Sequence, residues 1–113
     1  MAKQNIDNLC NILENIKEQA KNENLRLTQH GQQEIAKEDV KLSDLFEAIA
    51  TSEILENYPE HQRGSCCLIY GTTKSGKNLH IVCTTSLTTL IVITAYIPKP
   101  PKWITSTQMR KIQ

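Results

Sequence analysis

The hydrophobic period of the chain changes from that of a helix to that of a strand near residue 52. Before this point apolar residues recur at spacings of three and four, as on one face of an amphipathic helix. After it they alternate with polar residues, and Ile, Val and Thr become frequent, as in half-buried strands. The 113 residues fit one domain. Helices followed by consecutive strands predict the α+β class.

The positions of the expected elements follow from the same period. Helices are expected over residues 4–21, 29–38 and about 42–51, and strands over 53–58, 65–70, 78–85 and 90–97. Thr28 is the expected N-cap of the second helix, and Ser43 or Asp44 that of the third. Residues 25–27 are read as a short strand or an extended link. Short polar loops separate the strands, which predicts an antiparallel meander.

The chain is expected to have three parts within a single domain. These are an N-terminal amphipathic helix over residues 1–24, an α+β core over 25–98 and a basic tail over 99–113. The tail is rich in proline and lysine, and Trp103 is its only large apolar anchor.

Charge is divided unevenly along the sequence. Residues 1–60 hold all 12 carboxylates against 6 cations, whereas residues 61–113 hold 7 cations and no carboxylate. This asymmetry predicts a C-terminal half that binds a polyanion or an acidic partner. The alternative is an exposed dipole that serves no partner.

The cysteines and the N-terminus indicate the compartment. The four cysteines have no paired spacing of the kind seen in structural zinc sites; they are Cys10, Cys66, Cys67 and Cys83. No apolar run resembles a signal peptide or a membrane span. A soluble, cytoplasmic protein with reduced thiols and neither metal nor cofactor is therefore expected. Of the adjacent Cys66 and Cys67, one is expected in the core and the other near the surface.

Residues 71–77, read as GTTKSGK, match the first seven positions of a phosphate-binding P-loop. The next residue is Asn78 rather than the Ser or Thr that would hold magnesium, and the loop leads into a strand rather than a helix. A hairpin loop with two lysines is therefore predicted.

The register of the last hairpin gives His80 its expected surroundings. If Ile81 and Cys83 pair with Ile91 and Ile93 in the core, paired residue numbers sum to an even value. His80 then shares a face with Thr94 and Tyr96. The alternative is a half-buried strand histidine without a chemical role.

The sequence gives weaker evidence of a chemical role for the other two histidines. His30 follows Thr28 by two residues, near a helix N-terminus that favours a neutral imidazole or a bound anion. A surface helix residue is the alternative. His61 lies in a polar loop and is expected to be exposed.

An ordered set of short strings resembles one family. The strings are TQHG at 28–31, EILENYP at 53–59, SCCLIYG at 65–71, GKNLHIV at 76–82 and ITAY at 93–96. Together they resemble the uncharacterised domain family 4258, a group of small bacterial proteins, over about residues 25–98. Its pattern has a His-Ala pair, a Tyr-Pro strand end, Leu-His-Val-Val and Ile-Thr-x-Tyr.

The resemblance implies the fold and activity of RelE/BrnT-type toxins, with helices on a four-stranded antiparallel sheet. It also implies a zinc-finger antitoxin partner of the MqsA/YgiT type. His30, His80, Thr94 and Tyr96 match the family's motif residues. The family often has a basic helix after the first histidine, whereas this chain has Gln33, Glu34, Lys37 and Glu38 there.

The resulting hypothesis is a type II toxin that cuts RNA without a metal, as mRNA interferases do. The 2′-OH of RNA attacks the adjacent phosphate when a base, an acid and positive charge are in place. The residues expected to act are His30, His80, Thr94 and Tyr96 in catalysis, and Tyr58, Arg63 and Lys77 in contact with RNA.

Two alternatives use the same sequence features. One is a non-catalytic module that binds RNA or an acidic protein. The other is a homodimer formed by edge pairing of residues 90–97, which are strongly β-prone.

Overall fold

The computed structural model describes residues 2–60, 64–85 and 88–98. The helices are α1 (Ala2–Lys21), α2 (Gln29–Lys37) and α3 (Leu42–Ala50). The strands are β1 (Leu25–Leu27), β2 (Glu53–Tyr58), β3 (Cys66–Thr72), β4 (Asn78–Thr84) and β5 (Leu90–Tyr96). The predicted α+β class and the order of its elements are confirmed. His61, Arg63 and the expected basic tail lie outside the described residues.

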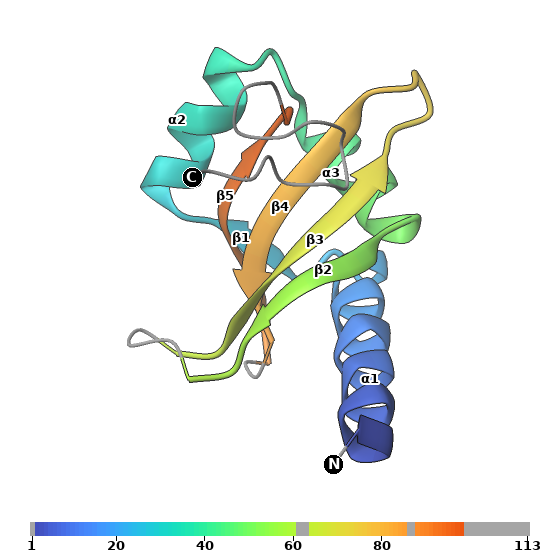
Figure 1. Cartoon of the computed structure of the whole chain (residues 1–113). Helices are drawn as coiled ribbons and strands as arrows, with labels where there is room; N and C mark the ends of the chain where they lie inside the picture. Colours follow the sequence, from blue (N-terminus) through green and yellow to red (C-terminus); the bar gives the residue numbers. More distant parts are fainter. Residues whose placement is uncertain (1, 61–63, 86–87, 99–113) are drawn as a thin grey trace, which may run out of the picture.

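The sheet has five strands in the order β1-β5-β4-β3-β2 (Figure 1). The four antiparallel strands of the expected meander are present, but the expected count of four is wrong, because β1 pairs in parallel with β5. This pairing joins residues that are 65 positions apart in the sequence, so no local pattern reveals it. It also covers Leu90, Ile91 and Val92 on that side of β5, so these three of the residues 90–97 are not available for the expected edge pairing.

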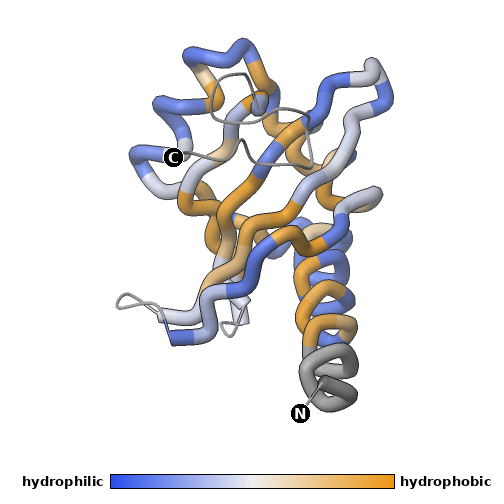
Figure 2. Tube along the Cα trace, viewed as in Figure 1, coloured by the Kyte–Doolittle hydropathy of each residue, from blue (hydrophilic) through white to orange (hydrophobic). Residues whose placement is uncertain are grey.

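The hydrophobic core lies between the sheet and the helices α1 and α3. Successive strand residues point to opposite faces, so one face of each strand supplies the core. In Figure 2 the hydrophobic residues gather on the central strands and along one side of α1. The largest fully buried core residues are Ile16, Leu45, Ile49, Ile69, Leu79, Ile81, Leu90 and Val92. None of the helices formed by the described residues is long and apolar enough to cross a membrane.

A β-bulge changes the register within the last hairpin. Ile81 pairs with Ala95, so the expected even sum is confirmed there. After Val82 the register shifts and Cys83 pairs with Val92. The expected core partners, Ile91 and Ile93, are therefore wrong, because one extra residue in β5 reverses the alternation.

Thr28 ties this bulge to the start of α2. Its hydroxyl donates to the Ile93 carbonyl at 2.8 Å, and its backbone N–H donates to the Val92 carbonyl at 3.1 Å. The same hydroxyl accepts from Gly31 N–H at 2.9 Å, which confirms Thr28 as the N-cap.

The start of α3 differs from the prediction. The N-cap is Lys41, and the Asp44 carboxylate accepts from the Lys41 N–H at 2.9 Å. Ser43 and Asp44 are therefore inside the helix, and Asp44 reaches back to the cap from the first turn.

Gly71 allows α3 to lie directly on the sheet. A Cβ at this position would be 1.8 Å from the carbonyl oxygen of Ala48. Any side chain there would push α3 away from β3. The glycine is required by this close approach and not by a special backbone angle.

We predict that Gly71→Ala lowers the free energy of unfolding by about 3 kcal/mol or more, since overpacked cores cannot relax around a backbone atom. Urea unfolding followed by circular dichroism measures the loss. Gly31→Ala is the matched comparison: its Cβ would be 3.1 Å from the nearest atom, so a much smaller change is expected. Equal stabilities of the two variants would contradict this packing.

Candidate functional site

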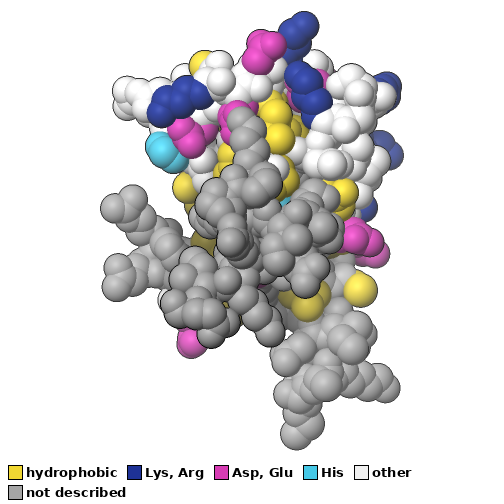
Figure 3. Space-filling model, turned by 45° about the horizontal axis from the view of Figure 1, so that its top comes forward, with side chains coloured by type: hydrophobic (Ala, Val, Ile, Leu, Met, Phe, Trp, Pro, Cys, Tyr) yellow, Lys and Arg dark blue, Asp and Glu magenta, His cyan; other side chains and the backbone are white. Residues whose placement is uncertain are grey.

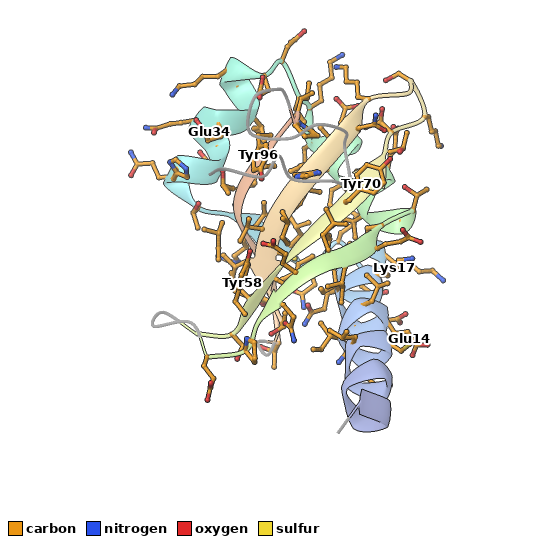
Figure 4. The ribbon with its side chains drawn as sticks, in the orientation of Figure 1. Glu14, Lys17, Glu34, Tyr58, Tyr70 and Tyr96 are labelled. Atoms are coloured by element: carbon orange, nitrogen blue, oxygen red, sulfur yellow. The ribbon has the colours of Figure 1, made fainter. Side chains whose placement is uncertain are left out.

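Three rings lie side by side across the sheet, on the face opposite α1 and α3. Tyr70 of β3 pairs with His80 of β4, and His80 pairs with Tyr96 of β5. The Tyr70 and His80 ring centroids are 6.0 Å apart with planes at 83°. The His80 and Tyr96 centroids are 5.4 Å apart with planes at 58°. We call these residues the ring row; Figure 4 shows its two tyrosines on either side of β4.

The ring row confirms the predicted shared face of His80 and Tyr96. Thr94 lies on this face too, opposite Val82. It is half-buried, like both tyrosines. His80 itself is 0% exposed. The two tyrosines are therefore the partly exposed members of the ring row, and the buried imidazole packs between their rings.

Asn78 and Thr72 contact the Tyr70 end of the ring row. The Tyr70 hydroxyl donates to the Asn78 Oδ1 at 3.3 Å, and the Thr72 hydroxyl donates to the same oxygen at 3.0 Å. Sequence reasoning did not name Tyr70 or Asn78 as site residues. Pairing the strands on either side of the GTTKSGK loop would have placed Tyr70 opposite His80.

The loop of residues 71–77 is the predicted hairpin. The Thr73 N–H donates to the Lys77 carbonyl at 2.9 Å, and the chain continues directly into β4. No helix N-terminus follows that would bind phosphate.

His30 makes no contact with the ring row. It lies in the first turn of α2, is exposed, and forms no hydrogen bond or ring contact with a ring-row member. α2 packs along β5 and β1 at the edge of the sheet, and Thr28 fixes its start there. The two histidines that the sequence motifs suggested as partners therefore lie on different elements and do not contact each other.

Lys77 is engaged in contacts with acidic segments. Its ammonium donates to the Asp39 carbonyl at 3.2 Å and lies 3.8 Å from the Asp44 carboxylate. These contacts join the β3–β4 turn to the loop before α3. The expected phosphate contact would have to compete with this ion pair.

Carboxylates from the N-terminal half also reach the ring-row face. Glu53 pairs with Tyr70 and Glu56 pairs with Leu68, so both project on this side of the sheet. Tyr58, 38% exposed, donates its hydroxyl to the Glu56 carboxylate. Figure 3 shows cationic and acidic side chains mixed over the end of the molecule near α2. The sequence halves of opposite charge therefore meet in the fold.

The buried cysteines lie in the same central strands. Cys67 and Cys83 are directly opposite in the core. A hydrogen bond with the Cys67 thiol, followed by burial, raises the pKa of Cys83 well above its ordinary value. Burial, with Cys67 nearby, raises the pKa of Cys66. Cys66 is buried on the ring-row face, so the expectation that one of the adjacent pair would be near the surface is wrong.

No group of three potential metal ligands is present among residues 2–60, 64–85 and 88–98. All four cysteines are free thiols, and Cys10 is the exposed one.

A family comparison matches most of the chain. The model described as "Domain of unknown function (DUF4258)" matches residues 27–97, a range that includes the whole ring row. The comparisons with curated proteins and with solved structures gave no match.

We predict that stability falls at alkaline pH and that Cys83 contributes to the fall. The native fold keeps this thiol protonated, whereas the unfolded chain releases its proton near pH 8.5. The unfolded state then binds fewer protons, so the free energy of unfolding decreases as pH rises beyond that value, by up to about 1.4 kcal/mol per pH unit for one thiol.

Urea titrations at pH 7, 9 and 10 measure this slope. Cys83→Ala should be less stable at pH 7 but should lose less stability between pH 7 and 10. Cys10→Ser, which changes an exposed thiol, is the control and should keep the wild-type slope. Parallel slopes for wild type and Cys83→Ala would contradict the prediction.

Proposed function

The chain belongs to the DUF4258 family, and we propose that it binds single-stranded RNA on the ring-row face of its sheet. The observation that carries this proposal is the pair of half-buried tyrosines, Tyr70 and Tyr96, held on either side of a buried imidazole. RNA is the ligand class because the family resemblance points to toxins that act on RNA.

Stacking explains how such a face would bind. Unpaired bases stack on aromatic side chains displayed by a sheet, and each such contact contributes about 1–3 kcal/mol. Tyr70 and Tyr96 lie on strands that flank β4, so one strand separates them. Neighbouring strands are about 4.8 Å apart, which gives a span of about 10 Å. Two bases of an extended strand can therefore occupy the two rings.

The charges on this face suggest where the phosphates would run. β3, β4 and β5 carry no carboxylate, whereas β2 brings Glu53 and Glu56 to the same side. A polyanion is repelled by the β2 edge and tolerated over the three central strands. RNA would therefore cross the ring row and avoid Tyr58, which is bonded to Glu56.

We predict that Tyr70→Ala and Tyr96→Ala each weaken binding to a fluorescein-labelled single-stranded RNA by about 5- to 150-fold, the loss of one stacking contact. The Tyr→Phe variants should bind nearly as well as wild type. Tyr58→Ala is the matched control, since this tyrosine is exposed on the same sheet but bonded to Glu56.

Fluorescence anisotropy at several salt concentrations measures these affinities. Wild-type affinity in both alanine variants, or an equal loss in Tyr58→Ala, would refute the ring row as the binding face.

A second candidate function is RNA cleavage as the toxin of a type II pair, with a zinc-finger antitoxin as partner. It is favoured by the imidazole between two phenols, a set of acid–base groups that needs no metal. His80 would take the 2′-OH proton as the 2′ oxygen bonds to phosphorus. The bond from phosphorus to the 5′ oxygen then breaks, and Tyr96 would protonate that oxygen, leaving a 2′,3′-cyclic phosphate.

The burial of His80 sets a demand on this second candidate, because the imidazole must become accessible when RNA binds. We predict that any cleavage persists in EDTA, yields 2′,3′-cyclic phosphate ends, and falls at least about 100-fold in His80→Gln, the usual contribution of one acid–base group. Gel analysis of labelled RNA measures the rate, and His30→Gln is the control. Intact RNA with wild-type protein would exclude cleavage and leave binding.

A further inference from the structure

The Asn78 side chain is held in one orientation at the hydroxyl edge of Tyr70. Its Oδ1 accepts from the Tyr70 hydroxyl and from the Thr72 hydroxyl. A carbonyl oxygen has two lone pairs, so these two bonds use its accepting capacity. The amide cannot rotate by half a turn without losing both.

The amide nitrogen of Asn78 is left to donate. Among the described residues no atom accepts a hydrogen bond from Nδ2. Nδ2 is also not among the buried polar atoms that lack a hydrogen-bond partner. Asn78 is half-buried at the start of β4, two residues from His80 and on the same face. Its two N–H groups therefore project beside the ring on which we propose that a base stacks.

A base on Tyr70 would bring its hydrogen-bonding edge to this amide. Uracil and guanine carry a carbonyl oxygen on the edge where cytosine and adenine carry an amine. Asparagine usually pairs with adenine by accepting and donating at once. Here the accepting atom is occupied by Tyr70 and Thr72, so Asn78 offers donors only.

We infer that Asn78 gives the ring-row face a preference for bases with a carbonyl oxygen at C4 (uracil) or C6 (guanine) over cytosine and adenine, which carry an amine at that position. This inference rests on the proposed RNA binding and adds the base that the Tyr70 position selects. Stacking itself does not discriminate, because every base has an aromatic face. The preference therefore depends on Asn78 and its two hydroxyl donors.

The test compares labelled decamers of uridine and of cytidine, whose bases differ in the carbonyl or amine at C4 and in the proton on N3. Wild type should bind the uridine decamer about 3- to 10-fold more tightly, the value of one neutral hydrogen bond. Asn78→Asp, which replaces the donor by an acceptor, should reverse the order of the two affinities. Asn78→Ala should bind both decamers equally.

Thr72→Val keeps Asn78 but removes one of the two bonds that orient it, so its uridine preference should decrease. This variant also tests the inference if Asn78→Asp does not fold, which circular dichroism reports. Equal wild-type affinities, or an unchanged ratio in Asn78→Ala and Thr72→Val, would overturn the inference while RNA binding stands. Failure of wild type to bind either decamer would instead refute the proposed function.

Discussion

The register of β3, β4 and β5 determines the rest of this structure. Ile69, Ile81 and Ala95 are opposite one another and are fully buried against the helices. Because side chains alternate between faces, the next residue of each strand must point the other way. The ring row of Tyr70, His80 and Tyr96 is therefore a consequence of the core. A slip of one residue would put these rings among the helices and the isoleucines in their place.

The helices reinforce this register at two places on the sheet. α3 lies so close to β3 that only Gly71 fits beneath Ala48. At the β1–β5 end of the sheet, the Thr28 hydroxyl and N–H donate to the Ile93 and Val92 carbonyls at the bulge of β5. These two bonds fix the start of α2 there. The extra residue of the bulge, Ile93, lies three residues before Tyr96, so the pair of Tyr96 and His80 keeps its register. Packing and site geometry thus depend on the same few backbone contacts.

Local periodicity was sufficient to predict the helices, the four antiparallel strands and the shared face of His80 and Tyr96. It suggested a short strand or an extended link over residues 25–27, but it could not predict that this segment pairs in parallel with β5, which is distant in sequence. Nor could it predict the bulge, since no single residue type in β5 signals an extra residue. The place of Tyr70 in the site could have been predicted, because the hairpin that contains GTTKSGK pairs Tyr70 with His80.

Charge was the least predictable feature, because it depends on which segments meet. The carboxylate-free half supplies the three central strands, but β2 from the acidic half completes their sheet. Lys77, expected to hold phosphate, contacts the Asp39 carbonyl and the Asp44 carboxylate. The asymmetry along the sequence therefore becomes an asymmetry across one face, with acids at the β2 edge and none on β3 to β5.

The central claim is that the ring-row face is the functional surface of the molecule. A nuclear magnetic resonance titration with unlabelled single-stranded RNA tests it most directly, because backbone and aromatic signals report contact at each residue. The account predicts that the largest shifts occur at Tyr70, Asn78 and Tyr96, with little change along α1. Shifts confined to the helices, or none at millimolar RNA, would contradict it.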